Sequence, residues 1–119
     1  MTAASIIAAV GDTARRIGQN EALFREVNDR IERVTESLQV QTDQIAILCE
    51  CGDQTCTERI EVSPAEYERV RGEPTSFFVC SGHEQLDYED VIERHPRYSV
   101  VRKRQGPPAD IARELDPRD

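Results

Sequence analysis

The stretch Cys49-Glu-Cys-Gly-Asp-Gln-Thr-Cys56 decides the fold of this chain, together with Cys80-Ser-Gly-His83 further along. These two segments contain all four cysteines and one of the two histidines. Thiolate sulfur and imidazole nitrogen are the ligands that tetrahedral zinc prefers, and a structural zinc site uses four of them. The sequence therefore predicts a structural Zn²⁺ ion as cofactor, held by four of these five side chains.

Three of the ligands follow from the spacing within residues 49–56. On a strand, Cys49 and Cys51 lie on the same face, because side chains alternate between the two faces. Gly52 permits the sharp backbone reversal that returns Cys56 to the same point. We therefore expect these three thiolates to converge on the metal.

The fourth ligand must come from another part of the chain, and the residues alone leave Cys80 and His83 open. His95 is less suitable, since it lies further along and precedes a proline. Two other arrangements compete with structural zinc. The cysteines could be buried without a metal, since Cys packs well as a small apolar residue. Alternatively, Cys80 could lie beside a His83-ligated site as the partner in a thiol redox switch.

Short elements surround this motif. The apolar run Ile45–Cys49 and the alternating run Thr57–Val62 predict a β-hairpin. Ser63 and Glu66 form a capping box that predicts a helix over 64–71, ending before Gly72. The remaining predicted elements are a strand over 75–80, a helix over 86–94, a strand over 98–102 and a tail over 105–119 with one helical turn near Ile111.

Residues 12–41 predict a long amphipathic helix. Apolar side chains recur every seven residues, and a second set follows three residues after them, as in a coiled coil. The six residues of this heptad stripe are Ile17, Phe24, Val27, Ile31, Val34 and Leu38. Asn20 falls at a seam position, where a polar residue sets the register. Acid-before-base pairs four residues apart, at 21/25, 26/30 and 29/33, are typical of an exposed helix face.

The heptad stripe could pack on a second copy of the chain, on another protein or on this protein's own sheet. A helix of this size is about 42 Å long at 1.5 Å per residue, which exceeds the small domain that follows it. Length therefore favours self-association or a protein partner.

These elements define an α+β fold. We expect a flexible N-terminus over 1–11, a coiled-coil-like helix over 12–41 and a small mixed zinc-binding domain with a β-hairpin over 42–104. A C-terminal tail over 105–119 completes the chain.

Composition and charge limit the possible functions. With 119 residues, 38% of them hydrophobic, the chain can form one domain with a thin core, which a bound metal would stabilise. The net charge of −8 argues against general binding to nucleic acid or an anionic membrane. Residues 1–10 are too short to span a bilayer. Clustered cysteines without a targeting segment favour a metal site in the cytoplasm over disulfides. A small basic cluster, which we expect to be a solvated strand end, consists of Arg97, Arg102, Lys103 and Arg104.

Residues 49–56 resemble the zinc motif that follows the SET domain of methyltransferases, in which Cys-x-Cys-Gly-x3-Cys provides three ligands and a remote cysteine the fourth. No SET core surrounds the motif, so the resemblance implies the metal geometry and no methyltransferase activity.

Over most of its length the chain is also similar to small uncharacterised actinobacterial proteins. The similarity lies in residues 20–28 and 51–60, in Pro74-Thr75 and in Gly82-His83-Glu84. It implies a zinc-finger-like domain behind an N-terminal helix, without an established activity. In those proteins a residue that cannot bind metal commonly stands at the position of Cys80. The similarity therefore favours one ligand set: Cys49, Cys51, Cys56 and His83.

We expect this site to be structural, because three thiolates neutralise zinc and weaken it as a Lewis acid. Glu50 is expected to face solvent and Asp53 to be a turn residue. The expected function is that of a cytoplasmic, non-enzymatic zinc protein that acts as an interaction or regulatory module, with a role in transcription. The alternatives are a redox sensor that uses Cys80 and a small zinc-dependent enzyme.

Overall fold

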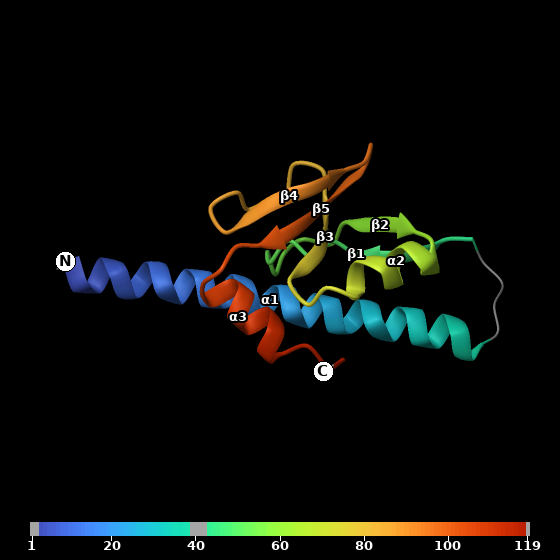
Figure 1. The fold of residues 1–119 in the computed structure, drawn as a ribbon, viewed down its shortest axis with the longest axis horizontal. Coiled ribbons are helices and arrows are strands. Elements are labelled where there is room, and N and C mark those ends of the chain that lie inside the picture. Colours follow the sequence, from blue (N-terminus) through green and yellow to red (C-terminus); the bar gives the residue numbers. More distant parts are fainter. Residues whose placement is uncertain (1–2, 39–42, 119) are drawn as a thin grey trace.

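The computed structural model describes residues 3–38 and 43–118, with the side chains of the first helix described from Thr13 onward. The elements in chain order are α1 (Ala3–Ser37), β1 (Ile45–Leu48), β2 (Arg59–Val62), α2 (Pro64–Arg71), β3 (Ser76–Cys80), β4 (Glu89–Arg94), β5 (Tyr98–Lys103) and α3 (Pro107–Glu114). The predicted α+β class is confirmed: a long helix precedes a small domain of short strands and helices (Figure 1).

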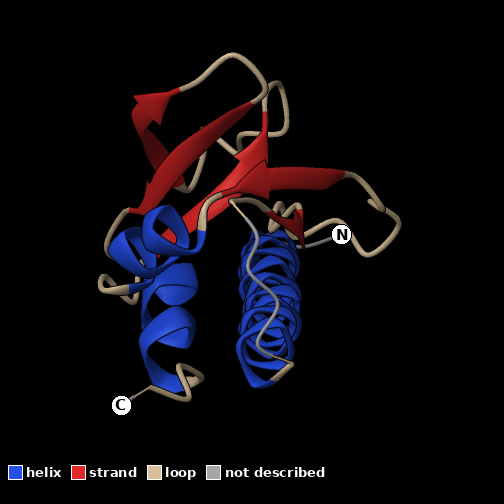
Figure 2. Cartoon of the chain, turned by 90° about the vertical axis from the view of Figure 1, so that its right-hand side faces the viewer, coloured by secondary structure: helices blue, strands red, loops and turns tan. Residues whose placement is uncertain are grey.

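Two small antiparallel sheets lie over α1 (Figure 2). Strands β1 and β2 form the predicted hairpin, with Ile45 opposite Val62. The second sheet has the order β3-β5-β4. The apolar core lies between the sheets and α2, where Tyr67 stacks on Phe78 with ring centroids 5.8 Å apart.

Local sequence signals correctly predict several elements. The helix over 64–71 is α2, and its capping box forms: the backbone N–H of Glu66 donates to the Ser63 hydroxyl at 3.1 Å. The strands predicted over 75–80 and 98–102 are β3 and β5.

The helix predicted over 86–94 is wrong. This segment contains strand β4, in which Val91 pairs with Val101 of β5. The β5 strand offers β4 a full set of antiparallel backbone partners, so tertiary pairing overrides the local helical pattern.

The C-terminal tail predicted over 105–119 is also corrected, because it contains α3, which packs against α1. Ala109 and Ala112 are buried in this contact layer. Ile111 lies against Gly18, where an added Cβ would meet it at 3.4 Å. Small residues on both helices thus allow them to approach closely.

The boundaries of α1 differ from the prediction. The helix begins at Ala3, so residues 3–11, expected to be flexible, belong to it. This segment is rich in alanine, the best helix former. The predicted end at residue 41 lies outside the described residues. Within the described ranges, no helix is both long and apolar enough to cross a membrane.

Helix α1 turns a polar face toward its own domain. From Thr13 onward, and apart from small residues, its buried side chains are all polar or charged: Glu21, Arg25, Asn28, Asp29 and Glu32. The pairs at 21/25 and 29/33 were expected on an exposed face, and burial of Glu21, Arg25 and Asp29 contradicts this. The Glu26–Arg30 pair lies on the surface as predicted, with its charged atoms 3.4 Å apart.

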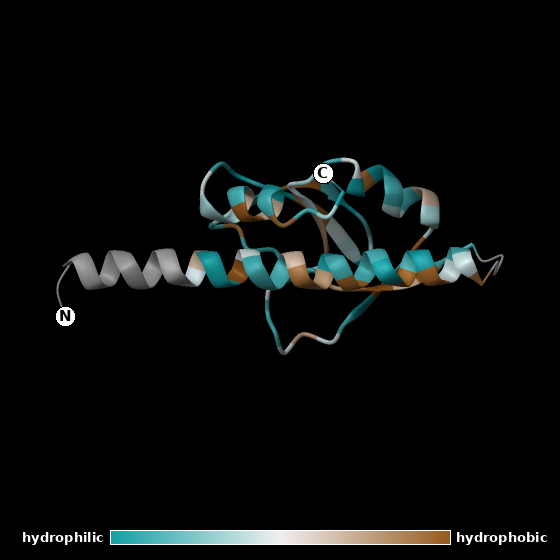
Figure 3. Ribbon diagram, turned by 90° about the horizontal axis from the view of Figure 1, so that it is seen from below, coloured by the Kyte–Doolittle hydropathy of each residue, from teal (hydrophilic) through white to brown (hydrophobic). Residues whose placement is uncertain are grey.

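The heptad stripe lies largely outside the core. Its first four residues, Ile17 to Ile31, are half-buried, whereas Val34 and Leu38 expose 55% and 68% of their surface. Leu23, beside the stripe, is 56% exposed. In Figure 3 the hydrophobic positions of α1 gather toward the edge that faces away from α2 and α3.

Arg25 fixes this orientation of α1. Its guanidinium donates to the carbonyl of Ala112 on α3 at 2.7 Å and to the carbonyl of Pro74 before β3. It also lies 4.7 Å from the centroid of the Phe77 ring. One fully buried side chain thus joins α1, α3 and the second sheet.

A second buried group joins α1 to α2 and the C-terminal segment. Arg71 donates two hydrogen bonds of 2.9 Å to Asp29 and one of 2.9 Å to Asp116. The Tyr67 hydroxyl also donates to Asp29, at 2.6 Å. Burial opposes ionisation of Asp29, but the hydrogen bonds from Arg71 and Tyr67 hold its pKa below the usual range.

The basic cluster predicted at a solvated strand end is partly buried. Arg97, Arg102 and Arg104 are exposed, but Lys103 is 4% exposed and lies between the carboxylates of Glu21 and Glu89. The ammonium group therefore has buried acidic partners on both α1 and β4, which explains how a lysine can occupy this position.

Candidate metal centre

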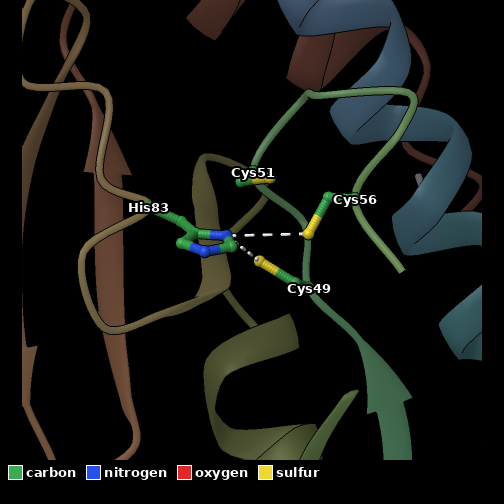
Figure 4. A group of neighbouring side chains, drawn as sticks. All are labelled: Cys49, Cys51, Cys56 and His83. Atoms are coloured by element: carbon green, nitrogen blue, oxygen red, sulfur yellow. Dashed lines mark hydrogen bonds between the residues drawn. The ribbon is translucent and has the colours of Figure 1, made fainter. Parts of the chain in front are cut away.

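Three thiols and one imidazole converge beyond the end of β1 (Figure 4). The ligand atoms of Cys49, Cys51, Cys56 and His83 all lie within 4.8 Å of one another. His83 Nδ1 is 3.5 Å from the Cys49 sulfur and 3.6 Å from the Cys56 sulfur. In a tetrahedral zinc site, bonds of about 2.3 Å to sulfur and 2.0–2.1 Å to nitrogen place these atoms about 3.6 Å apart. The spacing of the group therefore fits an ion such as Zn²⁺.

The loop over residues 50–56, the metal loop, is folded tightly enough to return Cys56 to Cys49. Gly52 has φ +83°, a left-handed conformation that glycine adopts without strain. Asp53 is the predicted turn residue: its carboxylate accepts from the backbone N–H of Thr55 at 2.9 Å. The N–H of Cys56 then donates to the Asp53 carbonyl at 3.0 Å.

Glu50, predicted to face solvent, is only 1% exposed. Its backbone N–H donates to the Phe78 carbonyl at 2.8 Å, and its carboxylate accepts from the Phe78 N–H at 2.8 Å. It also accepts from the Asn28 side chain at 2.9 Å. Burial raises the pKa of Glu50 to about 7. Glu50 therefore links the start of the metal loop to β3 and α1.

The metal loop packs directly on α1. The Asn20 side chain donates to the Gly52 carbonyl at 3.0 Å and accepts from the Gln54 side chain at 3.1 Å. A Cβ on Gly52 would lie 2.9 Å from Cγ2 of Ile17. Asn20, assigned from the sequence to a coiled-coil seam, instead binds this loop. Its heptad position gave no signal of that role, since its partner is 32 residues away.

His83 occupies the fourth position of the group, and Cys80 does not. Cys80 ends β3, and the N–H of His83 donates to its carbonyl at 2.9 Å, closing a turn through Gly82 with φ +91°. This turn carries the imidazole to the other three ligands. Cys80 instead directs its backbone N–H to the Cys49 sulfur, at 3.2 Å.

The chemistry of the thiols suits a cation. A hydrogen bond with Cys49 lowers the pKa of Cys51 to about 5, although burial opposes this. The pKa of Cys49 is raised, by the same hydrogen bond and by burial. Burial also raises the pKa of Cys56. The thiolate form is therefore favoured at Cys51, and a bound cation would stabilise the thiolates of Cys49 and Cys56.

A second group of ionisable side chains lies on the surface at Glu66, Glu93 and His95. Arg69 already occupies it, with hydrogen bonds of 2.8 Å to each oxygen of Glu93 and 2.6 Å to Glu66. Hydrogen bonds from Arg69 and His95 lower the pKa of Glu93 to about 2. This group is a surface ion pair, in contrast to the half-buried to buried Cys3His group.

No known protein family matches the chain, and neither a curated protein nor a solved structure matches it significantly. The resemblances noted in the sequence therefore stay predictions. The Cys3His group itself could hold a metal ion such as zinc.

Proposed function

We propose that this chain is a structural-zinc protein that binds another protein through α1. Zinc would occupy the Cys3His group and fix the metal loop against α1. The apolar residues of α1 would bind a helix of the partner protein. The observation that carries this proposal is the orientation of α1, which buries its polar face and leaves Val34 and Leu38 of the heptad stripe exposed.

The orientation of α1 is specified by polar contacts. Arg25, Asn28 and Asp29 each bond to a different part of the domain: to Ala112, to Leu48 and to Arg71. These bonds leave the helix no alternative rotation that keeps its buried charges paired, and an unpaired buried charge costs several kcal/mol. The domain's own folding therefore gives no reason for exposed apolar residues at Val34 and Leu38, whereas binding a partner does.

A helix is the occupant that fits. Apolar residues at heptad spacing match the seam of another helix, since both then repeat every 3.5 residues. Among the described side chains of α1, from Thr13 onward, the exposed charged residues are four arginines and two glutamates: Arg15, Arg16, Arg30, Arg33, Glu26 and Glu36. A partner helix with acidic residues beside its seam would complement this excess. A second copy is less suitable, because an antiparallel pair would place Arg16 and Arg30 of one copy beside those of the other.

Synthetic helical peptides test this proposal. One peptide has leucine and isoleucine seam positions with glutamate flanks, and the other has the same seam with lysine flanks. Fluorescence anisotropy should show that the glutamate peptide binds at least about tenfold more tightly, a difference of about 1.4 kcal/mol. Leu38→Asp should abolish binding, whereas Leu86→Asp, at another exposed leucine (61%) outside α1, should not.

Two outcomes would contradict this function. Equal binding to wild type and Leu38→Asp would show that the α1 stripe is not the docking surface. A wild-type dimer in light scattering that Leu38→Asp converts to monomers would show that a second copy is the occupant.

A structural role for the zinc is supported by its predicted shell. Three sulfurs and one nitrogen complete a tetrahedral site, whereas catalytic zinc keeps a position open for water or substrate. We therefore propose that the metal stabilises a small domain rather than activates a substrate.

A further inference from the structure

Cys80 is a fifth metal-ligand side chain that touches the metal group without belonging to it. It is half-buried, whereas Cys49 is only 1% exposed. Its N–H lies 3.2 Å from the Cys49 sulfur. The backbone of Cys80 is therefore in contact with the Cys49 sulfur.

The backbone holds this pair in place. Glu50, next to Cys49, exchanges hydrogen bonds with Phe78, two residues before Cys80. The end of β3 therefore crosses the start of the metal loop at Cys49. A disulfide requires Cα atoms about 4.4–6.8 Å apart, and an N–H of Cys80 in contact with the Cys49 sulfur brings the two residues close to that range.

We propose that Cys80 is an oxidative modification site that forms a disulfide with Cys49 and thereby releases the metal. A peroxide is the oxidant. The half-buried Cys80 sulfur attacks the peroxide, the O–O bond breaks, and Cys80 becomes a sulfenic acid as water leaves. The Cys49 thiolate then attacks the Cys80 sulfur, the S–O bond breaks, and hydroxide leaves. Two electrons pass from the two sulfurs to the peroxide.

Loss of Cys49 removes one of the four ligands. Two thiols and one imidazole do not complete a structural zinc shell, so the ion dissociates. The metal loop would then lose the constraint that holds Gly52 and Asn20 together at α1. The Cys49–Cys80 disulfide is thus an oxidised form of the protein with a released metal loop, and it forms whether or not α1 binds a partner.

The test uses the full zinc-loaded chain treated with hydrogen peroxide. Intact mass should fall by about 2 Da, because two thiols become one disulfide, and a chromogenic chelator should record zinc release with the same rate. Proteolytic cleavage after Glu50 separates Cys49 from Cys51 and Cys56, so mass spectrometry can assign the linked cysteine. The expected product links Cys49 to Cys80.

Cys80→Ser is the matched variant, since it changes only the sulfur. It should bind zinc like the wild type and release it at least about tenfold more slowly under peroxide. A variant that fails to bind zinc would overturn the proposal, because Cys80 would then be a ligand. A disulfide confined to Cys49, Cys51 and Cys56, or release that is equally fast in Cys80→Ser, would also overturn it.

Discussion

Gly52→Ala tests how closely the metal loop packs against α1. The substitution places a Cβ on a residue with φ +83°, 2.9 Å from Cγ2 of Ile17 and 3.2 Å from the Ile17 carbonyl oxygen. The left-handed backbone costs an L-residue about 1–2 kcal/mol, and overpacking costs about 1–3 kcal/mol. We expect Gly52→Ala to lower the free energy of unfolding by roughly 2–5 kcal/mol, measured by urea denaturation of the zinc-loaded protein.

Gly82→Ala is the control for this measurement. Gly82 has a similar φ of +91°, but an added Cβ there meets no atom within 4 Å. It should therefore show only the backbone cost of about 1–2 kcal/mol. Ile17→Ala combined with Gly52→Ala should recover part of the loss, because it removes the closest atom. Equal losses in the two glycine variants, with no coupling to Ile17, would refute the close packing of loop and helix.

Three further predictions concern the buried polar face of α1. Arg25→Met should lower the free energy of unfolding by about 3–5 kcal/mol, since it removes two charge-assisted hydrogen bonds from a buried site. Arg33→Met, at an exposed position, should change it by less than about 0.5 kcal/mol. Similar urea midpoints for the two variants would contradict this prediction. A chain that ends at Gly106 lacks α3 and the Arg71–Asp116 contact. Its melting temperature, measured by circular dichroism, should therefore be much lower than that of the full chain. An unchanged melting temperature would show that the segment after Gly106 is a dispensable tail. Burial raises the pKa of Glu21 to about 8 from its ordinary 4.5, so between these values the folded state retains a proton that the unfolded state loses. The stability of the wild type should therefore fall relative to that of Glu21→Gln as the pH rises from 5 to 8. A constant difference in unfolding free energy across this range would contradict the raised pKa.

The metal group was predictable from the sequence because its determinants are local. Cys49, Cys51 and Cys56 share a short loop whose glycine permits the reversal. The choice between Cys80 and His83 was not local, since it depends on the turn through Gly82 that points the imidazole at the thiols. Residue spacing alone leaves both within reach.

The orientation of α1 was not predictable from its pattern. Heptad spacing identifies the apolar stripe, but it does not reveal which face the domain covers. That choice depends on Arg71 and Lys103, which lie far along the chain from their partners Asp29 and Glu21 on α1. Ionisable residues that looked solvent-exposed in isolation, such as Glu21 and Asp29, are buried because they pack against these partners.

The second sheet shows a similar dependence on distant partners. Residues 86–94 contain both acidic and apolar side chains that suit a helix or an edge strand. Only the antiparallel pairing of Val91 with Val101 selects the strand. Likewise, the prolines before Ala109 suggested a tail, although proline is also common in the first turn of a helix.

The most direct test of the account is the metal shell of the purified protein. Metal analysis and X-ray absorption should show one zinc ion per chain with three sulfur ligands at about 2.3 Å and one nitrogen at about 2.0–2.1 Å. His83→Ala should lose this ion, whereas Cys80→Ser should keep it. A shell of four sulfurs, or a protein that binds no zinc, would contradict the assignment of Cys49, Cys51, Cys56 and His83.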